Sequence, residues 1–446
     1  MKNKIILIAL FLVSLAQAQD KKQAFSFSLK EAIEHAVQNN YSAKNASKDV
    51  EAAQQKKWET TAMGLPQVNG SLGYQDNFIL QKSLIPAELF GGTPGTFAAV
   101  AFGTKQNMGA SIGVTQLLFD GSYLVGLQAS KVYLNISENA KIKTNQEIKE
   151  LVIKSYGNVL LADESIKVLV KNKAILDKTL FDTQETYKNG LIEEENVEQL
   201  QITLSSVKSA LANTNRMRTI ANDMLKLLLG IDLENDLTLK DKLDDLTKNN
   251  IDLALLKEEF NVTNTIDYQI GKNAEESKSL LVKLEKSKAL PSLGLGYNLG
   301  ANAFANDFNF MNKDQKWLNY SNIGLNLKVP LFSSFARSSR TQQAKIALEQ
   351  AKTKLTETEQ NLKLQFEQAK SQYEYSLEQF NTAKNNLSLS ERIENKQQIK
   401  FKEGLSSSFN LTEAQRQLYT AQQNYLQTMV DVINSKATLE KLLNKN

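Results

Sequence analysis

The stretch Leu65-Pro66-Gln67-Val68-Asn69-Gly70-Ser71-Leu72-Gly73-Tyr74 returns later in the chain as Leu290-Pro291-Ser292-Leu293-Gly294-Leu295-Gly296-Tyr297. The two copies lie in segments 64–126 and 290–331, which hold most of the glycines and all five prolines: Pro66, Pro86, Pro94, Pro291 and Pro330. Both residue types break helices, and neither occurs between Pro330 and Gly404. The sequence therefore predicts one architecture built twice, with two strand-forming segments set among very long helices.

Within these segments apolar residues alternate with small or polar ones. Val68 and Leu72 fall on one face of an extended chain, opposite Asn69 and Ser71, and the second segment repeats the pattern. Alternation over about 10 residues is typical of the strands of a membrane barrel. A soluble hairpin at the end of a coiled coil is the alternative interpretation. The pattern predicts four strands, at 67–78, 107–118, 291–301 and 320–330.

Aromatic residues gather where the predicted strands end, as in the interfacial girdle of a membrane barrel: Phe78, Phe102, Phe304, Phe308, Trp317 and Tyr320. Four strands are too few to close, and an open sheet edge is not tolerated in hydrocarbon. Membrane barrels have about eight strands or more, so the chain is expected to oligomerise, with two, three or four copies giving 8, 12 or 16 strands. The residues alone do not select among these numbers.

The remainder of the chain is predicted to be helical and coiled-coil-like. Apolar residues after Pro330 recur at steps of three and four, which favours long helices packed side by side. Glycine commonly ends a helix, so Gly190 and Gly404 are predicted to be turns between antiparallel helices. The first repeat is expected at 19–230 and the second at 251–446, joined by a linker at 231–250. The predicted helices are 28–63, 122–187, 193–229, 252–288, 333–400 and 409–443.

Composition excludes several functions. The formal net charge is +4, without a basic region suited to nucleic acid. The absence of cysteine excludes disulfides and thiolate metal sites. His35, the one histidine, is expected to be an ordinary surface or packing residue, which argues against a histidine-based metal centre or catalytic triad. The chain is therefore predicted not to be an enzyme, and to need no metal or cofactor.

The N-terminal residues have the pattern of a secretory signal peptide, predicted at 1–18. Lys2 and Lys4 precede the apolar stretch Ile5–Leu15, and Ala16-Gln17-Ala18 has the form of a cleavage site. The protein is thus expected to leave the cytoplasm.

Taken together, these features resemble the TolC-type outer-membrane efflux protein family over about 25–443. The repeated Leu-Pro strand starts at Pro66 and Pro291 carry the resemblance, with the strand ends Gln116-Leu117-Leu118-Phe119-Asp120-Gly121 and Val329-Pro330-Leu331-Phe332 and the paired turns. The resemblance implies a mixed α and β membrane protein of Gram-negative bacteria. It implies a homotrimer with a 12-stranded barrel in outer-membrane lipid, continuing into a periplasmic helical tunnel. It also implies docking to a periplasmic adaptor (membrane fusion protein) and to an inner-membrane pump, of the resistance-nodulation-division class.

The family places its gate at the tunnel tip, after the turn glycines. The candidate gate or pore-lining residues here are Glu193, Glu194, Glu195, Asn196, Asn410 and Glu413. Family members commonly carry an aspartate at the positions of Asn196 and Asn410, and some use an arginine lock that is missing between Gly404 and Glu413. If Glu413 points inward, threefold symmetry gives a ring of carboxylates that favours cations. The alternative is that these glutamates are helix N-terminal charges favoured by the helix dipole.

The leading hypothesis for function is a passive exit duct for small toxic compounds, because no catalytic or nucleotide-binding pattern is present. The outer-membrane channel of a type I protein secretion system is an alternative. A structural coiled-coil envelope protein is a second alternative, although it would not need four alternating strands.

Overall fold

The computed structural model describes residues 23–445, and the predicted signal peptide lies outside them. The chain forms two compact units. Unit 1 contains residues 23–50, Ser137–Lys272 and 354–445, whereas unit 2 contains Glu51–Ile136 and Asn273–Thr353. Each unit therefore takes segments from both halves of the sequence.

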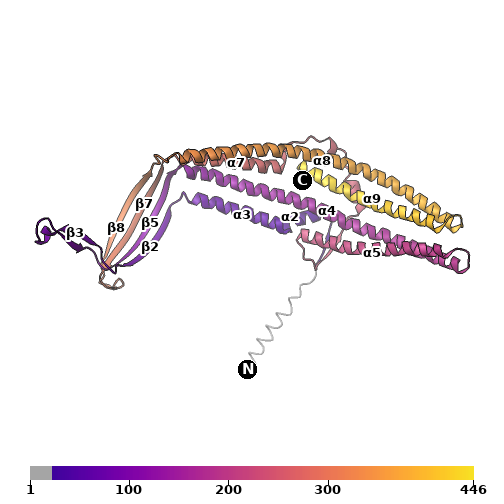
Figure 1. Cartoon of the computed structure of the whole chain (residues 1–446), viewed down its shortest axis with the longest axis horizontal. Helices are drawn as coiled ribbons and strands as arrows, with labels where there is room; N and C mark the ends of the chain where they lie inside the picture. The colour runs from indigo at the N-terminus through magenta and orange to yellow at the C-terminus, as the bar shows by residue number, and fades with distance from the viewer. Residues whose placement is uncertain (1–22, 446) are drawn as a thin grey trace, which may run out of the picture. The chain divides into compact units, whose positions relative to one another are not determined.

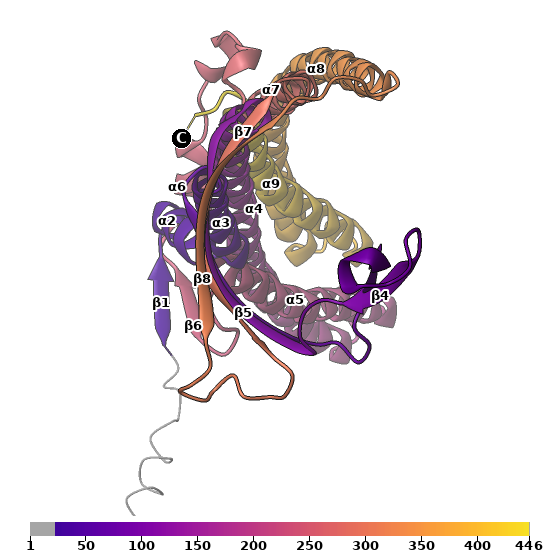
Figure 2. The ribbon, with the colours of Figure 1, turned by 90° about the vertical axis from the view of Figure 1, so that its left-hand side faces the viewer.

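Unit 2 is built on a four-stranded antiparallel sheet with the order β2-β5-β7-β8. The strands are β2 (Gln67–Asp76), β5 (Gln106–Asp120), β7 (Ser292–Ala305) and β8 (Trp317–Lys328), which lie side by side in Figure 1 and curve together in Figure 2. Strands β2 and β8 are the outer strands, so each leaves one edge unpaired within the chain. The predicted mixture of long helices with four antiparallel strands is confirmed.

The second hairpin is longer than predicted, because β7 continues to Ala305 and β8 begins at Trp317. Ala303 and Ala305 pack there with Phe310, and Trp317 packs against the same small cluster. This local burial extends the pairing beyond 301 and 320, where the sequence pattern weakens.

The connection between β2 and β5, residues 77–105, contains structure of its own. Strand β3 (Lys82–Pro86) pairs with β4 (Phe97–Ala101), and a 3-10 turn η1 (Ala87–Phe90) follows β3. The two strands have only five residues each, and the prolines and glycines around them make the strand pattern hard to recognise in the sequence.

Long helices form most of the rest of the chain: α3 (Tyr41–Ala62), α4 (Gly121–Lys188), α5 (Glu194–Leu229), α7 (Ile266–Ser287), α8 (Ala336–Lys402) and α9 (Ser408–Leu442). Helices α3, α4, α7 and α8 contribute residues to both units. None of the helices described has the length and apolarity needed to cross a bilayer.

The prediction of a single helix at 28–63 is wrong. The structure has two helices there, α2 (Leu29–Asn39) and α3, which are separated at Asn40. The Asn40 backbone is extended, and its side-chain oxygen accepts from the backbone N–H of Ser42 at 2.8 Å. Its amide nitrogen donates to the carbonyl of Leu228 at 2.7 Å. An asparagine can cap a helix in this way without any glycine or proline, so the break was missed.

The helix predicted at 252–288 is also wrong in its first half. Only α7 is regular, and the preceding residues form short 3-10 turns, η2 (Leu255–Lys257) and η3 (Val262–Asn264). The side chain of Asp252 accepts from the backbone of Ala254, and that of Asn261 accepts from Thr263. These local side-chain bonds compete with helix formation.

The segment 231–250 is structured rather than a simple linker. It contains β6 (Asp236–Leu239) and α6 (Leu243–Asn249), and β6 pairs in parallel with β1 (Ala24–Phe27). Both strands have four residues, too few for alternation to reveal them.

Two buried tyrosines fix these short segments to the long helices in unit 1. The Tyr156 hydroxyl of α4 donates to the Asp241 carboxylate at 2.9 Å and to the Phe27 carbonyl at 3.0 Å. The Tyr373 hydroxyl of α8 donates to the carbonyl of Asn250 at 2.8 Å and accepts from the backbone N–H of Asp252 at 2.9 Å. Both side chains belong to the main hydrophobic core.

Candidate functional site

Both predicted turn glycines lie in tight turns between antiparallel helices of unit 1. Gly190 follows α4 with φ of 72°, and Gly404 follows α8 with φ of 70°. The N–H of Gly190 donates to the carbonyl of Tyr187, and the N–H of Gly404 donates to that of Phe401. This left-handed helix ending suits glycine, because a side chain would add strain.

Asn196 joins the two turns. Its side-chain oxygen accepts from the backbone N–H of Ser408 at 3.2 Å, and its amide nitrogen donates to the carbonyl of Glu193 at 3.2 Å. Ser408 is the first residue of α9, whose free N–H groups need acceptors. Asn196 therefore caps a helix of the other repeat, which an aspartate could also do.

Asn410 lies beside the same junction, with its backbone N–H donating to the Ser407 hydroxyl at 3.4 Å. Asn196, Asn410, Glu193 and Gly404 all line a cleft of about 930 Å³ at the turns. The structure thus brings the two predicted asparagines together. In the sequence each asparagine follows its turn glycine at the same distance (Gly190 and Asn196, Gly404 and Asn410), which does not reveal that they share a cleft.

Glu193, Glu194 and Glu195 are exposed at the beginning of α5. Glu193 is the residue that precedes the helix, and the other two occupy its first turn. This is where the helix dipole favours negative charge, so the position of the run is explained by helix stability.

Glu413 is held by residues of its own helix. Arg416 donates to the two carboxylate oxygens at 2.9 Å and 2.6 Å, and Gln417 donates at 3.2 Å. The hydrogen bond from Arg416 is the main cause that lowers the pKa of Glu413. The Glu413 carboxylate is therefore ionised, but it is paired with the Arg416 guanidinium. Sequence reasoning missed Arg416 because it considered only residues up to Glu413, although a spacing of three on a helix was a usable signal.

A half-buried acid on α8 was also missed. Burial raises the pKa of Glu394, against the opposing effect of Gln415 beside it. Burial, and then the neighbouring Glu394 charge, raise the pKa of Tyr419 on α9. Tyr419 packs against Leu169, Leu200 and their neighbours. Nothing in the helical periodicity distinguishes Glu394 from the exposed glutamates around it.

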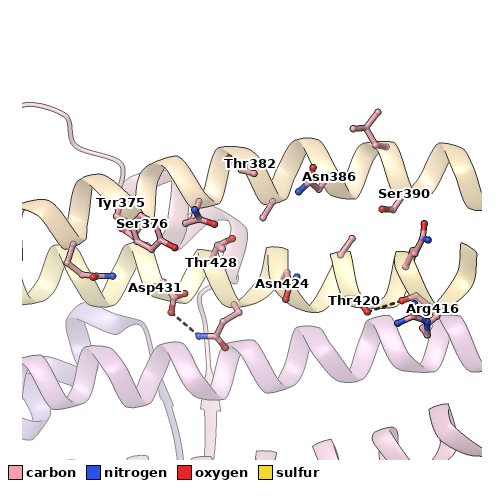
Figure 3. A pocket seen from close by; sticks show the side chains of 17 residues that line it. Tyr375, Ser376, Thr382, Asn386, Ser390, Arg416, Thr420, Asn424, Thr428 and Asp431 are labelled. Carbon is pink, nitrogen blue, oxygen red and sulfur yellow. Dashed lines mark hydrogen bonds between the residues drawn. The ribbon is translucent and has the colours of Figure 1, made fainter. Parts of the chain in front are cut away.

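Two polar grooves flank α9. The α8–α9 groove has a volume of about 690 Å³, and Figure 3 shows Thr382, Asn386, Thr420 and Asn424 among its lining side chains. The α5–α9 groove has about 700 Å³. Amide and hydroxyl side chains are the most frequent lining groups in both, and Arg416 is shared, although the α5–α9 groove also includes Ile202 and Val207. These surfaces offer hydrogen-bonding groups, but among the described residues they assemble no acid–base pair.

The predicted strand-end residues belong to unit 2, whereas the turns belong to unit 1. Pro66 and Pro291 immediately precede β2 and β7. Phe119 lies within β5, but Phe332 follows the end of β8. The equivalence predicted for these two phenylalanines is therefore not kept in the structure.

The sheet leaves two edges unpaired within the chain, and it is joined to long antiparallel helices. This is the fold expected of a subunit of a membrane channel. The Outer membrane efflux protein family matches residues 32–231 and 274–445. The chain belongs to this family, and is an outer-membrane efflux channel of Gram-negative bacteria rather than an enzyme.

Similar proteins match most of the chain. Outer membrane protein TolC of Vibrio cholerae is 24% identical over 343 residues, covering 76% of this chain and 73% of that protein. The structure of CusC superposes with a TM-score of 0.74 at 17% identity, covering 96% of this chain and 95% of CusC. The CmeC channel of Campylobacter jejuni gives 0.72 at 18% identity, covering 96% and 90%.

Proposed function

We propose that this channel is the exit duct of a tripartite efflux system, formed by three copies of the chain. The main observation behind this proposal is that β2 and β8 each have one edge without a partner strand in the chain. A bilayer does not tolerate such edges, so each must pair with another copy. Channels of this family are homotrimers, and three four-stranded sheets give a barrel of 12 strands. The helices then lie on the periplasmic side and the β3–β4 hairpin outside.

Conductance of the purified full-length protein in planar bilayers tests the duct. Stepwise ion conductance is expected, whereas a heat-unfolded sample of the same protein should give none. A folded oligomer that never conducts would rule out an open-ended duct and favour a structural envelope protein.

The proposed cargo is small toxic compounds. The α8–α9 and α5–α9 grooves offer mainly uncharged hydrogen-bonding groups, which suits passage of varied solutes without tight binding. Deleting the gene is expected to increase sensitivity to several unrelated dyes and antibiotics, with recovery on complementation. Unchanged sensitivity together with loss of a secreted protein would instead support type I secretion.

We infer that partners supply the energy, because the sequence has no nucleotide-binding pattern. The proposed partners are a periplasmic adaptor and an inner-membrane pump of the resistance-nodulation-division class. Chemical cross-linking in cells followed by purification should recover both with the channel. Recovery of an inner-membrane transporter of another class would reject this choice of pump.

A further inference from the structure

An exposed apolar stripe on β8 continues past the end of the strand. Ile323, Leu325 and Leu327 are exposed at alternate positions, and Val329 and Leu331 continue the series. Side chains at alternate positions project from one face of a strand. A neighbouring strand would pair with the backbone edge of β8 and would leave this face uncovered. The stripe therefore has the position of a lipid-contacting face.

The turn after β8 has a strained backbone and carries two exposed aromatic rings. Ser334 and Phe335 have φ of 48° and 63°, although neither is glycine. Such a conformation costs about 1–2 kcal/mol per residue. Phe332 and Phe335 are 78% and 75% exposed, with ring centres 6.2 Å apart. Among the described residues, neither ring belongs to a hydrophobic core cluster.

Arg337 stabilises this strained turn. Its guanidinium donates to the carbonyls of Pro330 at 2.8 Å and Leu331 at 3.3 Å, and to the hydroxyl of Ser333 at 3.1 Å. These charge-assisted bonds offset the backbone strain. The exposed rings thus belong to a turn that the fold holds in place.

The corresponding strand end of the first repeat is built differently. There β5 passes directly into α4, and the Asp120 side chain accepts from the N–H groups of Ser122 and Tyr123. Phe119 remains in the strand and is 41% exposed. The duplicated Leu-Phe sequence therefore presents projecting rings only in the second repeat.

Along the chain, the charges next to the second turn have one sign. From 321 to 348 the sequence has no acidic residue but carries four basic ones: Lys328, Arg337, Arg340 and Lys345. The exposed Arg340 follows the turn by one helical turn of α8. Apolar side chains bordered by basic groups suit the boundary between acyl chains and phosphate headgroups.

We propose that the turn 331–340 is a lipid anchor at the helix-side boundary of the bilayer. Phe332 and Phe335 insert among the acyl chains, and Arg340 contacts the phosphate of an anionic phospholipid. This lipid anchor depends on the proposed function in one respect, which is that the sheet lies in a bilayer. A second copy of the chain is the competing occupant of this surface.

Fluorescence quenching by brominated lipids tests the insertion. The full-length channel is reconstituted in phosphatidylglycerol-containing vesicles with Trp58→Phe, Trp317→Phe and Phe335→Trp, so that the new indole is the only one. Lipids brominated about 5–10 Å below the headgroups should quench it strongly, because interfacial side chains reach that depth. Phe409→Trp, at another exposed phenylalanine in unit 1, is the matched control and should not be quenched.

An indole that is blue-shifted but unquenched would show burial against another copy and would overturn the anchor. Absence of both effects would overturn it as well. Phe332→Trp provides the same measurement if Phe335→Trp fails to assemble. If the channel conducts ions but the indole is not quenched, only the lipid anchor is rejected. If the indole is quenched but the channel does not conduct, only the duct is rejected.

Retained lipid tests the phosphate contact. Native mass spectrometry of the channel should detect less bound phosphatidylglycerol after Arg340→Ser, but no change after Arg392→Ser at an exposed site on the same helix in unit 1. Equal retention by the two variants would overturn the assigned contact with Arg340.

Discussion

At the scale of single residues, the pairing of Glu413 with Arg416 changes what the helical turns contribute to ion selectivity. A carboxylate hydrogen-bonded to a guanidinium adds little net charge to a pore. We expect Glu413→Gln to leave cation preference almost unchanged, and Arg416→Gln to increase it by freeing three carboxylates per trimer. Reversal potentials in a salt gradient measure both effects.

Arg218→Gln is the matched control for Arg416, since Arg218 is also ion-paired, with Asp163 at 2.9 Å. A reversal potential for Arg416→Gln equal to that of this control would show that Glu413 does not face the conducting path.

Tyr156 tests the attachment of the short segments to α4. Removing its hydroxyl in Tyr156→Phe leaves the partly buried Asp241 carboxylate and the Phe27 carbonyl each without one hydrogen bond. A destabilisation of about 1–3 kcal/mol is expected, seen as a lower urea midpoint of unfolding. Tyr41→Phe, at an exposed site, should not shift the midpoint. Equal midpoints for the two variants would contradict the role of this hydroxyl.

Glu150 gives the helical unit a defined response to acid. Burial raises its pKa, but hydrogen bonds from Lys154 and Lys441 outweigh burial and lower it to about 2. A lowered folded-state pKa stabilises the protein above the unfolded value of 4.5, and this stabilisation is lost as pH falls from there towards 2. The urea midpoint should therefore fall over that range.

The variant Glu150→Gln should be less stable at neutral pH and should lose part of this acid dependence. Glu164→Gln, in a pair within one helix, is the comparison. An unchanged pH profile in Glu150→Gln would show that other carboxylates govern the acid response.

At the scale of elements, the turn glycines differ from a glycine inside a helix. Gly404 has positive φ, so Gly404→Ala should destabilise unit 1 by about 1–2 kcal/mol. Gly157 lies within α4, where an added Cβ would be 3.5 Å from Val430, an ordinary contact. Gly157→Ala should therefore be neutral or stabilising, by up to about 1 kcal/mol. Urea unfolding of both variants checks the difference, and equal effects would contradict it.

Elements with strong local signals could be predicted from the sequence, and those that depend on distant partners could not. The four long strands were found because alternation persists in each. Strands β1 and β6 were missed because each has four residues and is defined by the other, more than 200 residues away. Asn40 caps α3 locally through Ser42, but its second bond, to the carbonyl of Leu228, depends on a residue that local sequence does not reveal.

The candidate site shows the same division. Gly190 and Gly404 could be placed from the helix-ending signal that each provides alone. The contact of Asn196 with Ser408 depends on the packing of one repeat against the other, at a separation of 212 residues. The burial of Glu394 likewise depends on the packing of α9 against α8.

At the scale of the whole molecule, the unpaired edges of β2 and β8 set the assembly. Because β2 and β8 run in opposite directions within the sheet, β2 of one copy is expected to pair antiparallel with β8 of the next. The chain has no cysteine, so any disulfide must be introduced. Asn69→Cys on β2, combined in turn with a cysteine at each position from 319 to 327 on β8, should give covalent oligomers for the pairs that face each other.

Non-reducing gels of membranes from cells expressing these variants measure the cross-linking. The strongest product should have the size of three chains, because a closed ring links every copy to two neighbours. Gly113→Cys on β5, combined with the same β8 series, is the control and should remain monomeric, since β5 is already paired on both edges. A ladder with no limit at three chains would indicate open-ended association, which a closed barrel does not allow.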